Sequence, residues 1–421
     1  MVKTYPEHII NYEDQIYHCT RCGLCQSVCP VFDAVKTELS VARGKVALLQ
    51  GLLSDKLSFS RKMASYLELC TGCMACKEIC PSGISSDLIF QAAKEYAASK
   101  YGLSLPKKAI VETFSSEHAL SFFSTLLNLY TTTKAGFIAD NISFNLPFID
   151  KLKLLNSQVN GKTGLKLKNI HIKQVKPAYR LIYFPGCINQ YVNSSVAKAT
   201  LDILEKNNIE VVVPDQFYCC GMPALMSGQV ESAKELALRN LEIINTQNLS
   251  QYDYIVVDCG SCSYMLKYYE KLFNDNPQYQ EKFSQLKEKI IDVNAFIVNL
   301  DIKLPTITEE ITVTYHDPCH LRRSQSIYKE PRALIKSINN INYVEMPEAE
   351  SCCGASGSFC ITHPEVSKQI SIKKALNIES TGADIVLTSC PSCKVGIMQG
   401  GIAINKTFRV YHPVEIIHRY C

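Results

Sequence analysis

The residues best suited to chemistry in this chain are its cysteines, of which there are 20 in 421 residues. Eight of them fall in two compact runs, each with three cysteines at steps of three residues and a fourth followed directly by proline. The first run comprises Cys19, Cys22, Cys25 and Cys29, and the second comprises Cys70, Cys73, Cys76 and Cys80. Thiolates spaced in this way can line one face of a compact metal–sulfur centre, so the runs predict iron–sulfur chemistry.

The spacing C-x2-C-x2-C-x3-C-P is that of bacterial two-cluster ferredoxins, in which the fourth cysteine of a run reaches the other cluster. We therefore expect two [4Fe–4S] clusters with crossed ligand sets. The first set is Cys19, Cys22, Cys25 and Cys80, and the second is Cys70, Cys73, Cys76 and Cys29. A pair of structural zinc sites is the alternative, but zinc sites usually group cysteines as pairs separated by a longer gap.

Ten further cysteines form a pattern that occurs twice in the second half of the chain, at offsets of 131 to 133 residues. Each copy has a single cysteine, then two adjacent cysteines followed by glycine, then a C-x2-C pair. The copies are Cys187, Cys219, Cys220, Cys259 and Cys262, and Cys319, Cys352, Cys353, Cys390 and Cys393. Adjacent Cα atoms lie about 3.8 Å apart, so both neighbouring thiolates can reach one multi-iron centre. We expect one or two further iron–sulfur clusters in these CCG units, unless the thiols only pack as small apolar groups.

Three polar residues flank Cys319, namely His316, Asp317 and His320. They are candidate catalytic residues, because they could donate hydrogen bonds to cluster sulfurs or carry protons. The alternative is that His316 and Asp317 only cap the following helix.

Four other residues lie near these patterns without an assigned ligand role. Arg43 and Lys45 follow the first run and could raise the potential of its cluster, although a solvated face is the expectation we favour. Cys360 lies in a turn rich in glycine and serine, and Cys421 is the last residue of the sequence. Both of these cysteines are expected to be bystanders.

The elements that position the CCG cysteines follow one order in both copies: strand, cysteine, helix, strand, CCG triplet, helix, strand, C-x2-C. Strands that alternate with helices predict parallel βαβ packing, in which the carboxyl ends of the strands share one edge. The fold class is therefore α/β, with an N-terminal helical ferredoxin domain and two tandem Rossmann-like CCG repeats. The expected divisions are a ferredoxin domain (1–100), a helical connector and linker (101–178), repeat 1 (179–305) and repeat 2 (306–421).

Composition excludes several classes of protein. A net charge of +4 is too small to favour nucleic acid as the main partner. No stretch approaches 18 uninterrupted apolar residues, so no transmembrane segment is expected. The N-terminus lacks the apolar region of a secretory signal, which predicts a cytoplasmic protein with reduced thiols. In such a compartment clustered cysteines usually bind metal rather than form disulfides.

The complete cysteine order resembles the iron–sulfur subunit family of glycolate oxidase, lactate utilisation and anaerobic glycerol-3-phosphate dehydrogenase. ARGKVALLQGLL (42–53) resembles a segment of glycolate oxidase, and residues 186–229 and 260–279 resemble the CCG subunit of the lactate utilisation complex. The resemblance implies an oxidoreductase subunit that takes electrons from a separate FAD-containing 2-hydroxy acid dehydrogenase. It would pass them toward quinone or a membrane cytochrome, from a cytoplasmic or peripheral membrane position. No dinucleotide-binding fingerprint occurs in this chain, so the flavin would lie on the partner.

The completeness of both C-x2-C pairs is a departure from the glycolate oxidase subunits, which tend to lack parts of them. Complete units resemble heterodisulfide reductase, in which a CCG unit is thought to hold a non-cubane [4Fe–4S] cluster that cleaves a disulfide. The resemblance therefore implies a second function, in which the CCG centres are catalytic and a disulfide binds between the repeats. A scaffold with purely structural clusters is a third alternative.

Overall fold

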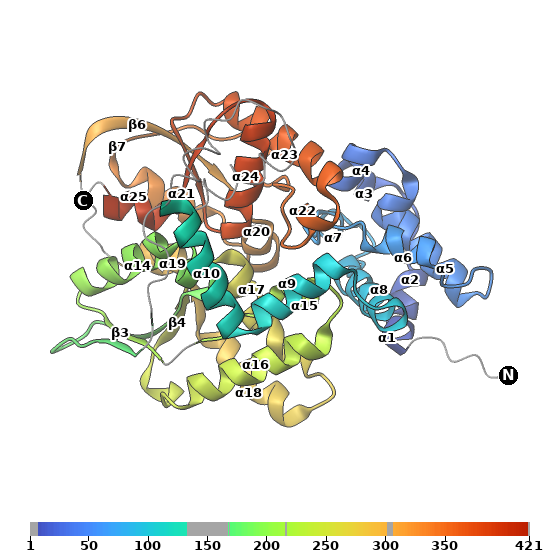
Figure 1. The fold of residues 1–421 in the computed structure, drawn as a ribbon, viewed down its shortest axis with the longest axis horizontal. Coiled ribbons are helices and arrows are strands. Elements are labelled where there is room, and N and C mark those ends of the chain that lie inside the picture. Colours follow the sequence, from blue (N-terminus) through green and yellow to red (C-terminus); the bar gives the residue numbers. More distant parts are fainter. Residues whose placement is uncertain (1–6, 133–166, 168, 215–216, 301–305, 420–421) are drawn as a thin grey trace.

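The computed structural model describes residues 7–132, 167, 169–214, 217–300 and 306–419, and Cys421 lies outside the described residues. A helical N-terminal part lies at one end of the molecule, beside a larger part that contains two sheets (Figure 1). The helices of the N-terminal part are α1 (Glu7–Ile10), α2 (Glu13–Tyr17), α3 (Leu24–Ser27), α4 (Pro30–Val35), the 3-10 helix η1 (Glu38–Ser40), α5 (Ala42–Leu53), α6 (Arg61–Glu68), α7 (Ala75–Glu78) and α8 (Ser86–Tyr101).

The core of this part forms where α5 and α8 present apolar side chains at helical spacing. Val46, Leu49 and Leu53 on α5 recur every three or four residues, and they pack with Ile89 and Ala93 of α8. Apolar residues recur at helical spacing within residues 40–57, which is the reason that α5 forms there. The helices leave the two cysteine runs in the loops and short turns between them.

The connector contains α9 (Leu105–Ser115) and α10 (Glu117–Thr132), which cross over the first repeat (Figure 1). Residues 133–166, most of the expected linker, lie outside the described residues. The end of the expected linker differs from the prediction, because Ile170–Ile172 forms strand β1 and pairs antiparallel with β3. Ile170 and Ile172 pack partly against the core, so these residues are part of the first sheet.

The first sheet has the strand order β1-β3-β2-β4-β5, and all its pairings except β1–β3 are parallel. Its strands are β2 (Arg180–Phe184), β3 (Glu210–Val213), β4 (Tyr254–Val257) and β5 (Ile290–Asp292). Most buried positions of these strands hold valine or isoleucine, and β2 also buries Leu181, Tyr183 and Phe184, as expected for strands covered on both faces. The helices around it are α13 (Gly186–Tyr191), α14 (Ser194–Lys206), α15 (Met222–Met226), α16 (Val230–Asn245), η2 (Leu249–Gln251), α17 (Gly260–Leu272), α18 (Pro277–Lys289) and α19 (Val293–Asn299).

The second sheet repeats this topology with the order β7-β6-β8-β9, and its described pairings are all parallel. Its strands are β6 (Thr306–His316), β7 (Asn339–Tyr343), β8 (Ile385–Thr388) and β9 (Arg409–Tyr411). Its helices are α20 (Cys319–Gln325), α21 (Lys329–Lys336), α22 (Phe359–Thr362), α23 (Pro364–Glu379), α24 (Pro391–Ala403) and α25 (Pro413–Arg419). The predicted α/β class and the predicted parallel repeats are therefore confirmed.

The two repeats pack against each other in a reciprocal way. Helix α14 of the first contacts α25 of the second, and α19 of the first contacts α21 of the second. Because α14 and α21 follow equivalent strands, as α19 and α25 do, the two contacts are the same contact with the roles exchanged. This is the pattern of an approximate twofold relation. One apolar core runs across both repeats and includes Val313 and Leu387 from one side and Val211 from the other.

Among the helices that the structure describes, none combines the length and apolar character needed to cross a membrane.

Candidate iron–sulfur sites

The first cysteine run lies at the start of α3 and reaches the surface. Cys22 is exposed, whereas Cys19 and Cys25 are partly buried. Burial raises the pKa of the Cys25 thiol, and the nearby Cys19 and Cys22 thiols raise it further. These three residues therefore lie close together, as a shared cluster requires.

Cys29 belongs spatially to the second run. It caps α4, where its sulfur accepts a hydrogen bond from the backbone N–H of Phe32 at 3.4 Å. Burial, together with the nearby Cys73 and Cys70 thiols, raises its pKa to about 12. Cys76 also lies near Cys29, Cys70 and Cys73. This proximity is what the crossed ligand set requires, and we propose that these four residues hold one cluster.

Buried lysines surround the second run. The Nζ atom of Lys45 donates to the Leu69 carbonyl at 2.6 Å, and that of Lys94 donates to the Cys70 carbonyl at 3.2 Å. Burial by itself raises the pKa of Cys70, but the two ammonium groups reverse this effect and hold it below its usual value. The expectation of a solvated Lys45 is wrong, because its side chain is only 1% exposed and lies over the ring of Phe90.

Replacing Lys45 by Met is expected to lower the midpoint potential of the cluster at Cys70 by on the order of 50 mV. Loss of a buried positive charge disfavours the reduced state, which carries more negative charge. A redox titration followed by EPR would measure the shift, with the exposed Lys62→Met as a matched control. An equal shift in both variants would contradict a specific role for Lys45.

The five cysteines of the first CCG unit converge although they are far apart in sequence. All of them are buried, and the sulfurs of Cys187 and Cys219 lie 3.7 Å apart. Cys262 lies within hydrogen-bonding reach of both Cys220 and Cys259. The strands β2, β3 and β4 end at the same edge of the sheet, which brings the loops that carry these residues together.

Glycine is required where each CC pair turns into the next element. Gly221 and Gly354 both have φ of +90°, a left-handed conformation that glycine adopts without strain. A Cβ atom on Gly354 would also lie 2.7 Å from the Ser367 carbonyl oxygen. The chain therefore turns sharply beside each CC pair.

The second CCG unit repeats this arrangement and adds a histidine. Cys353 lies within hydrogen-bonding reach of Cys352 and Cys393, and Cys393 lies within reach of Cys390. His316 joins them, since one of its ring nitrogens and the sulfurs of Cys353 and Cys393 all lie within 4.8 Å of one another. Free thiols gathered beside an imidazole that reaches the Cys353 sulfur form a donor set that fits an iron–sulfur centre.

The two CCG units meet through their C-x2-C segments. Cys259 and Cys390 occupy equivalent positions in the repeats, and their thiols lie within hydrogen-bonding reach of each other. The backbone N–H of Gly260 donates to the Ser389 carbonyl at 2.9 Å, and Ser261 Oγ lies 3.4 Å from the sulfur of Cys390. The two centres are therefore neighbours across the approximate twofold axis.

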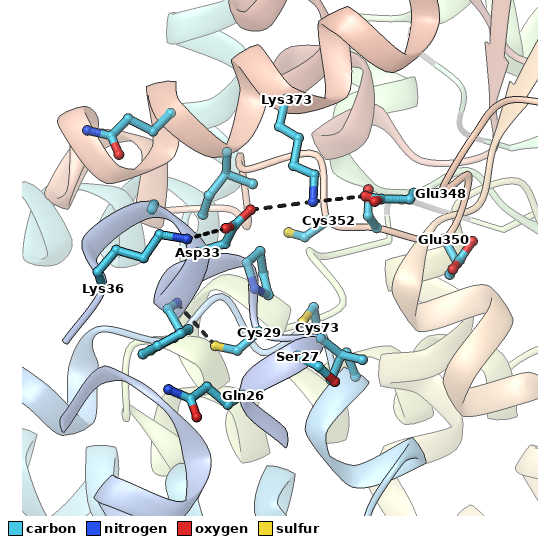
Figure 2. A pocket seen from close by; sticks show the side chains of 18 of the residues that line it. Gln26, Ser27, Cys29, Asp33, Lys36, Cys73, Glu348, Glu350, Cys352 and Lys373 are labelled. Carbon is cyan, nitrogen blue, oxygen red and sulfur yellow. Dashed lines mark hydrogen bonds and ion pairs between the residues drawn. The ribbon is translucent and has the colours of Figure 1, made fainter. Parts of the chain in front are cut away.

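The second cysteine run adjoins the second CCG unit. Cys73 and Cys352 belong to one buried cluster, together with Val31 and Phe359. The ion pair of Arg323 with Glu78, at 2.8 Å, also joins the N-terminal part to the second repeat. A cavity of about 770 Å³ opens at this junction, and Figure 2 shows Cys29, Cys73 and Cys352 facing it.

The three candidate catalytic residues have different environments. Asp317 is fully buried, and its carboxylate accepts hydrogen bonds from Arg322 and Arg332, both at 2.7 Å. His320 stacks on Tyr264 with ring centroids 4.9 Å apart. Neither His316 nor Asp317 caps the following helix α20 through its side chain, so the alternative of a purely capping role is wrong.

Three residues without a predicted role, Cys360, Arg323 and Lys94, are at least partly buried in the structure. Cys360 is partly buried, and burial raises its pKa to about 11, with its thiol donating to the Gly357 carbonyl at 3.4 Å. Arg323 and Lys94, which place positive charge beside the second run, were missed. No local pattern distinguishes them from surface cations, because their burial depends on residues distant in sequence, such as Cys70 for Lys94 and Glu78 for Arg323.

Comparison with known proteins identifies the domains. The cysteine-rich CCG domain matches residues 181–267 and 313–398, and the 4Fe-4S dicluster domain matches residues 15–84. Lactate utilization protein A of Bacillus licheniformis is 32% identical over 236 residues, which cover 56% of this chain and 97% of that protein. The chain belongs to the CCG-domain family of iron–sulfur subunits.

Other members of this family match over greater lengths. The probable glycolate oxidase iron-sulfur subunit of Bacillus subtilis is 27% identical, in a match that covers 96% of this chain and 94% of that protein. A CoM/CoB fumarate reductase subunit of Methanothermobacter marburgensis is 29% identical, in a match that covers 78% of this chain and 67% of that protein. The chain is thus an iron–sulfur oxidoreductase subunit of the glycolate oxidase-like type.

Proposed function

We propose that the chain is the electron-transfer subunit of a membrane-associated, FAD-dependent dehydrogenase of glycolate or lactate type. A flavoprotein partner oxidises the 2-hydroxy acid, and electrons pass through this chain toward quinone. The observation that carries the proposal is the spatial order of the cysteine sites. Cys29 of the first run lies beside the second run, and Cys73 of the second run lies beside Cys352 of the second CCG unit. Within that unit, Cys390 contacts Cys259 of the first CCG unit.

The proposal assigns four metal sites to this chain. A [4Fe–4S] cluster supplies one-electron redox chemistry when it is bound. The cluster sites are Cys19, Cys22, Cys25 and Cys80, and Cys70, Cys73, Cys76 and Cys29. The CCG sites are Cys187, Cys219, Cys220, Cys259 and Cys262, and Cys319, Cys352, Cys353, Cys390 and Cys393.

The first run is the proposed entry point for electrons from the flavoprotein. Cys22 is exposed, and the same segment carries the exposed apolar side chains Tyr17 and Leu24, at 49% and 47% exposure. Apolar side chains beside a redox site favour docking of a protein partner. The buried positive charges of Lys45 and Lys94 at the second run favour electron movement inward from this entry, because they stabilise the reduced state there.

The test is purification of the native complex with measurement of iron, flavin and reduction. We expect about 16 irons per chain if all four sites hold four each, and about eight if only the ferredoxin-type sites do. A co-purifying flavoprotein and reduction of the clusters by glycolate or lactate are expected. Native complex that contains no flavin subunit would overturn the proposal.

A reductase function is the second candidate, because a cavity lies directly beside the Cys352 thiol of the second CCG unit. Its wall carries charged groups of both signs, including the ion-pair chain of Asp33 with Lys373 at 3.4 Å and of Lys373 with Glu348 at 3.1 Å (Figure 2). A small polar substrate fits such a wall. The cavity lies between the ferredoxin-type domain and the second repeat, whereas the expected disulfide site was between the repeats.

Iron-loaded protein supplied with a reduced electron carrier would test this second function. It predicts thiol release from a low-molecular-weight disulfide and slower release in Lys373→Met, whose side chain faces the cavity. The exposed Lys406→Met, in the loop that follows α24, is the matched control. Absence of thiol release from fully loaded protein would rule the reductase out.

A further inference from the structure

The two CCG units differ at one buried position that precedes the first cysteine of each. The final residue of β2 is Phe184 and the final residue of β6 is His316, and each lies three residues before its cysteine. Both side chains are buried, with exposures of 0% and 1%. Phe184 packs on Phe217 with ring centroids 4.7 Å apart. In the first unit, therefore, this buried position is filled by an apolar ring that needs no hydrogen bond.

The buried His316 ring makes no well-formed hydrogen bond within the described part of the chain, at either Nδ1 or Nε2. The group within hydrogen-bonding reach of the ring is the Cys353 thiol, one of the proposed metal ligands. The adjacent carboxylate of Asp317 makes no hydrogen bond to the ring and instead accepts hydrogen bonds from Arg322 and Arg332. Burying a polar group without a partner costs on the order of 1–3 kcal/mol, so buried polar groups in folded proteins are almost always paired.

The position of the ring indicates what its partner is. One ring nitrogen lies within 4.8 Å of the sulfurs of Cys353 and Cys393, two thiols that the second unit directs into its centre. Neutral imidazole is a common ligand of iron, and it replaces thiolate at some iron–sulfur clusters.

We propose that His316 is a nitrogen ligand of the metal–sulfur centre in the second CCG unit, which makes the two centres chemically different. The first unit offers five thiols, and the second offers five thiols and one imidazole. This inference rests on the proposed occupancy of the second unit. Where the neutral imidazole takes the place of one thiolate, the centre carries one negative charge fewer, and its potential is more positive than that of an all-thiolate centre of the same type.

Pulsed EPR of the holoprotein, prepared with natural-abundance and with 15N-labelled histidine, tests the assignment. We expect nitrogen hyperfine coupling of the strength given by a direct metal–nitrogen bond, changing with the isotope. The coupling should vanish in His316→Cys, which offers a thiolate instead, and in His316→Phe, which copies the first unit. It should persist in His320→Phe, the matched control.

The other outcomes distinguish the ligand role of His316 from the proposed occupancy of the second unit. Full iron content without histidine coupling, or with only the weak coupling of a hydrogen-bonded ring, overturns the ligand role of His316 alone. Coupling that persists in iron-loaded His316→Cys does the same. Wild-type protein whose second unit holds no iron overturns the proposed occupancy and the ligand role together. If His316→Phe loses iron while His320→Phe retains it, the ligand role is supported independently of the coupling.

Discussion

Serine in place of Cys29 is expected to remove the cluster of the second run, although Cys29 belongs to the first run in sequence. The reason is spatial, since the Cys29 thiol lies beside those of Cys70, Cys73 and Cys76. Iron should fall by about four atoms per chain, in line with the loss of one [4Fe–4S] cluster. Because Cys73 adjoins Cys352, electron transfer to the CCG units should fall to background.

The matched control is Cys22→Ser, which alters the first run at its exposed end. The two variants should lose different EPR signals, and the signal that responds to Lys45→Met should be the one absent from Cys29→Ser. Iron analysis and EPR of the dithionite-reduced proteins measure both effects. If Cys29→Ser and Cys22→Ser lose the same signal, the crossed ligand sets are wrong.

Alanine in place of Gly400 is expected to destabilise the second repeat strongly. Helix α24 packs so closely on α23 that a Cβ atom at this position would lie 2.1 Å from the Ser371 carbonyl oxygen and 3.0 Å from the Ala375 Cβ. A backbone carbonyl cannot rotate away as a side chain can, so the helices must separate. Overpacking costs about 1–3 kcal/mol, or more where backbone must move, against about 1 kcal/mol gained in helix propensity.

The consequence should reach the metal site, because Ser371 Oγ donates to the Cys353 carbonyl at 2.9 Å. Calorimetry should show a melting temperature lowered by several degrees, and iron retention should decrease with it. Gly51→Ala is the control, since its Cβ would meet only the movable side chain of Leu57, at 2.6 Å. Similar melting temperatures for Gly400→Ala and wild type would contradict the close packing of α23 and α24.

Local patterns in the sequence determined most of the fold class and the grouping of cysteines. The duplicated order of strands, helices and cysteines predicted two parallel sheets, because strand and helix periods are properties of short segments. The glycine after each CC pair predicted the turn found at Gly221 and Gly354, because only its own backbone decides that conformation. The order of cysteines likewise placed the chain among the CCG-domain iron–sulfur subunits.

Only the tertiary structure decided how these parts meet. Lys45 follows the first run, and its sequence context predicts an exposed cation. The packing of α5 against α8 instead buries it beside Cys70. The contact of Cys259 with Cys390 depends on the twofold packing of the repeats. The spacing of cysteines within one repeat does not indicate how the two repeats pack. His316 and Asp317 are neighbours in sequence, yet the His316 ring lies beside Cys353 and Cys393 whereas Asp317 binds two arginines. Burial and pairing are set by residues distant in sequence, so the environment of each site could not be predicted from its own motif.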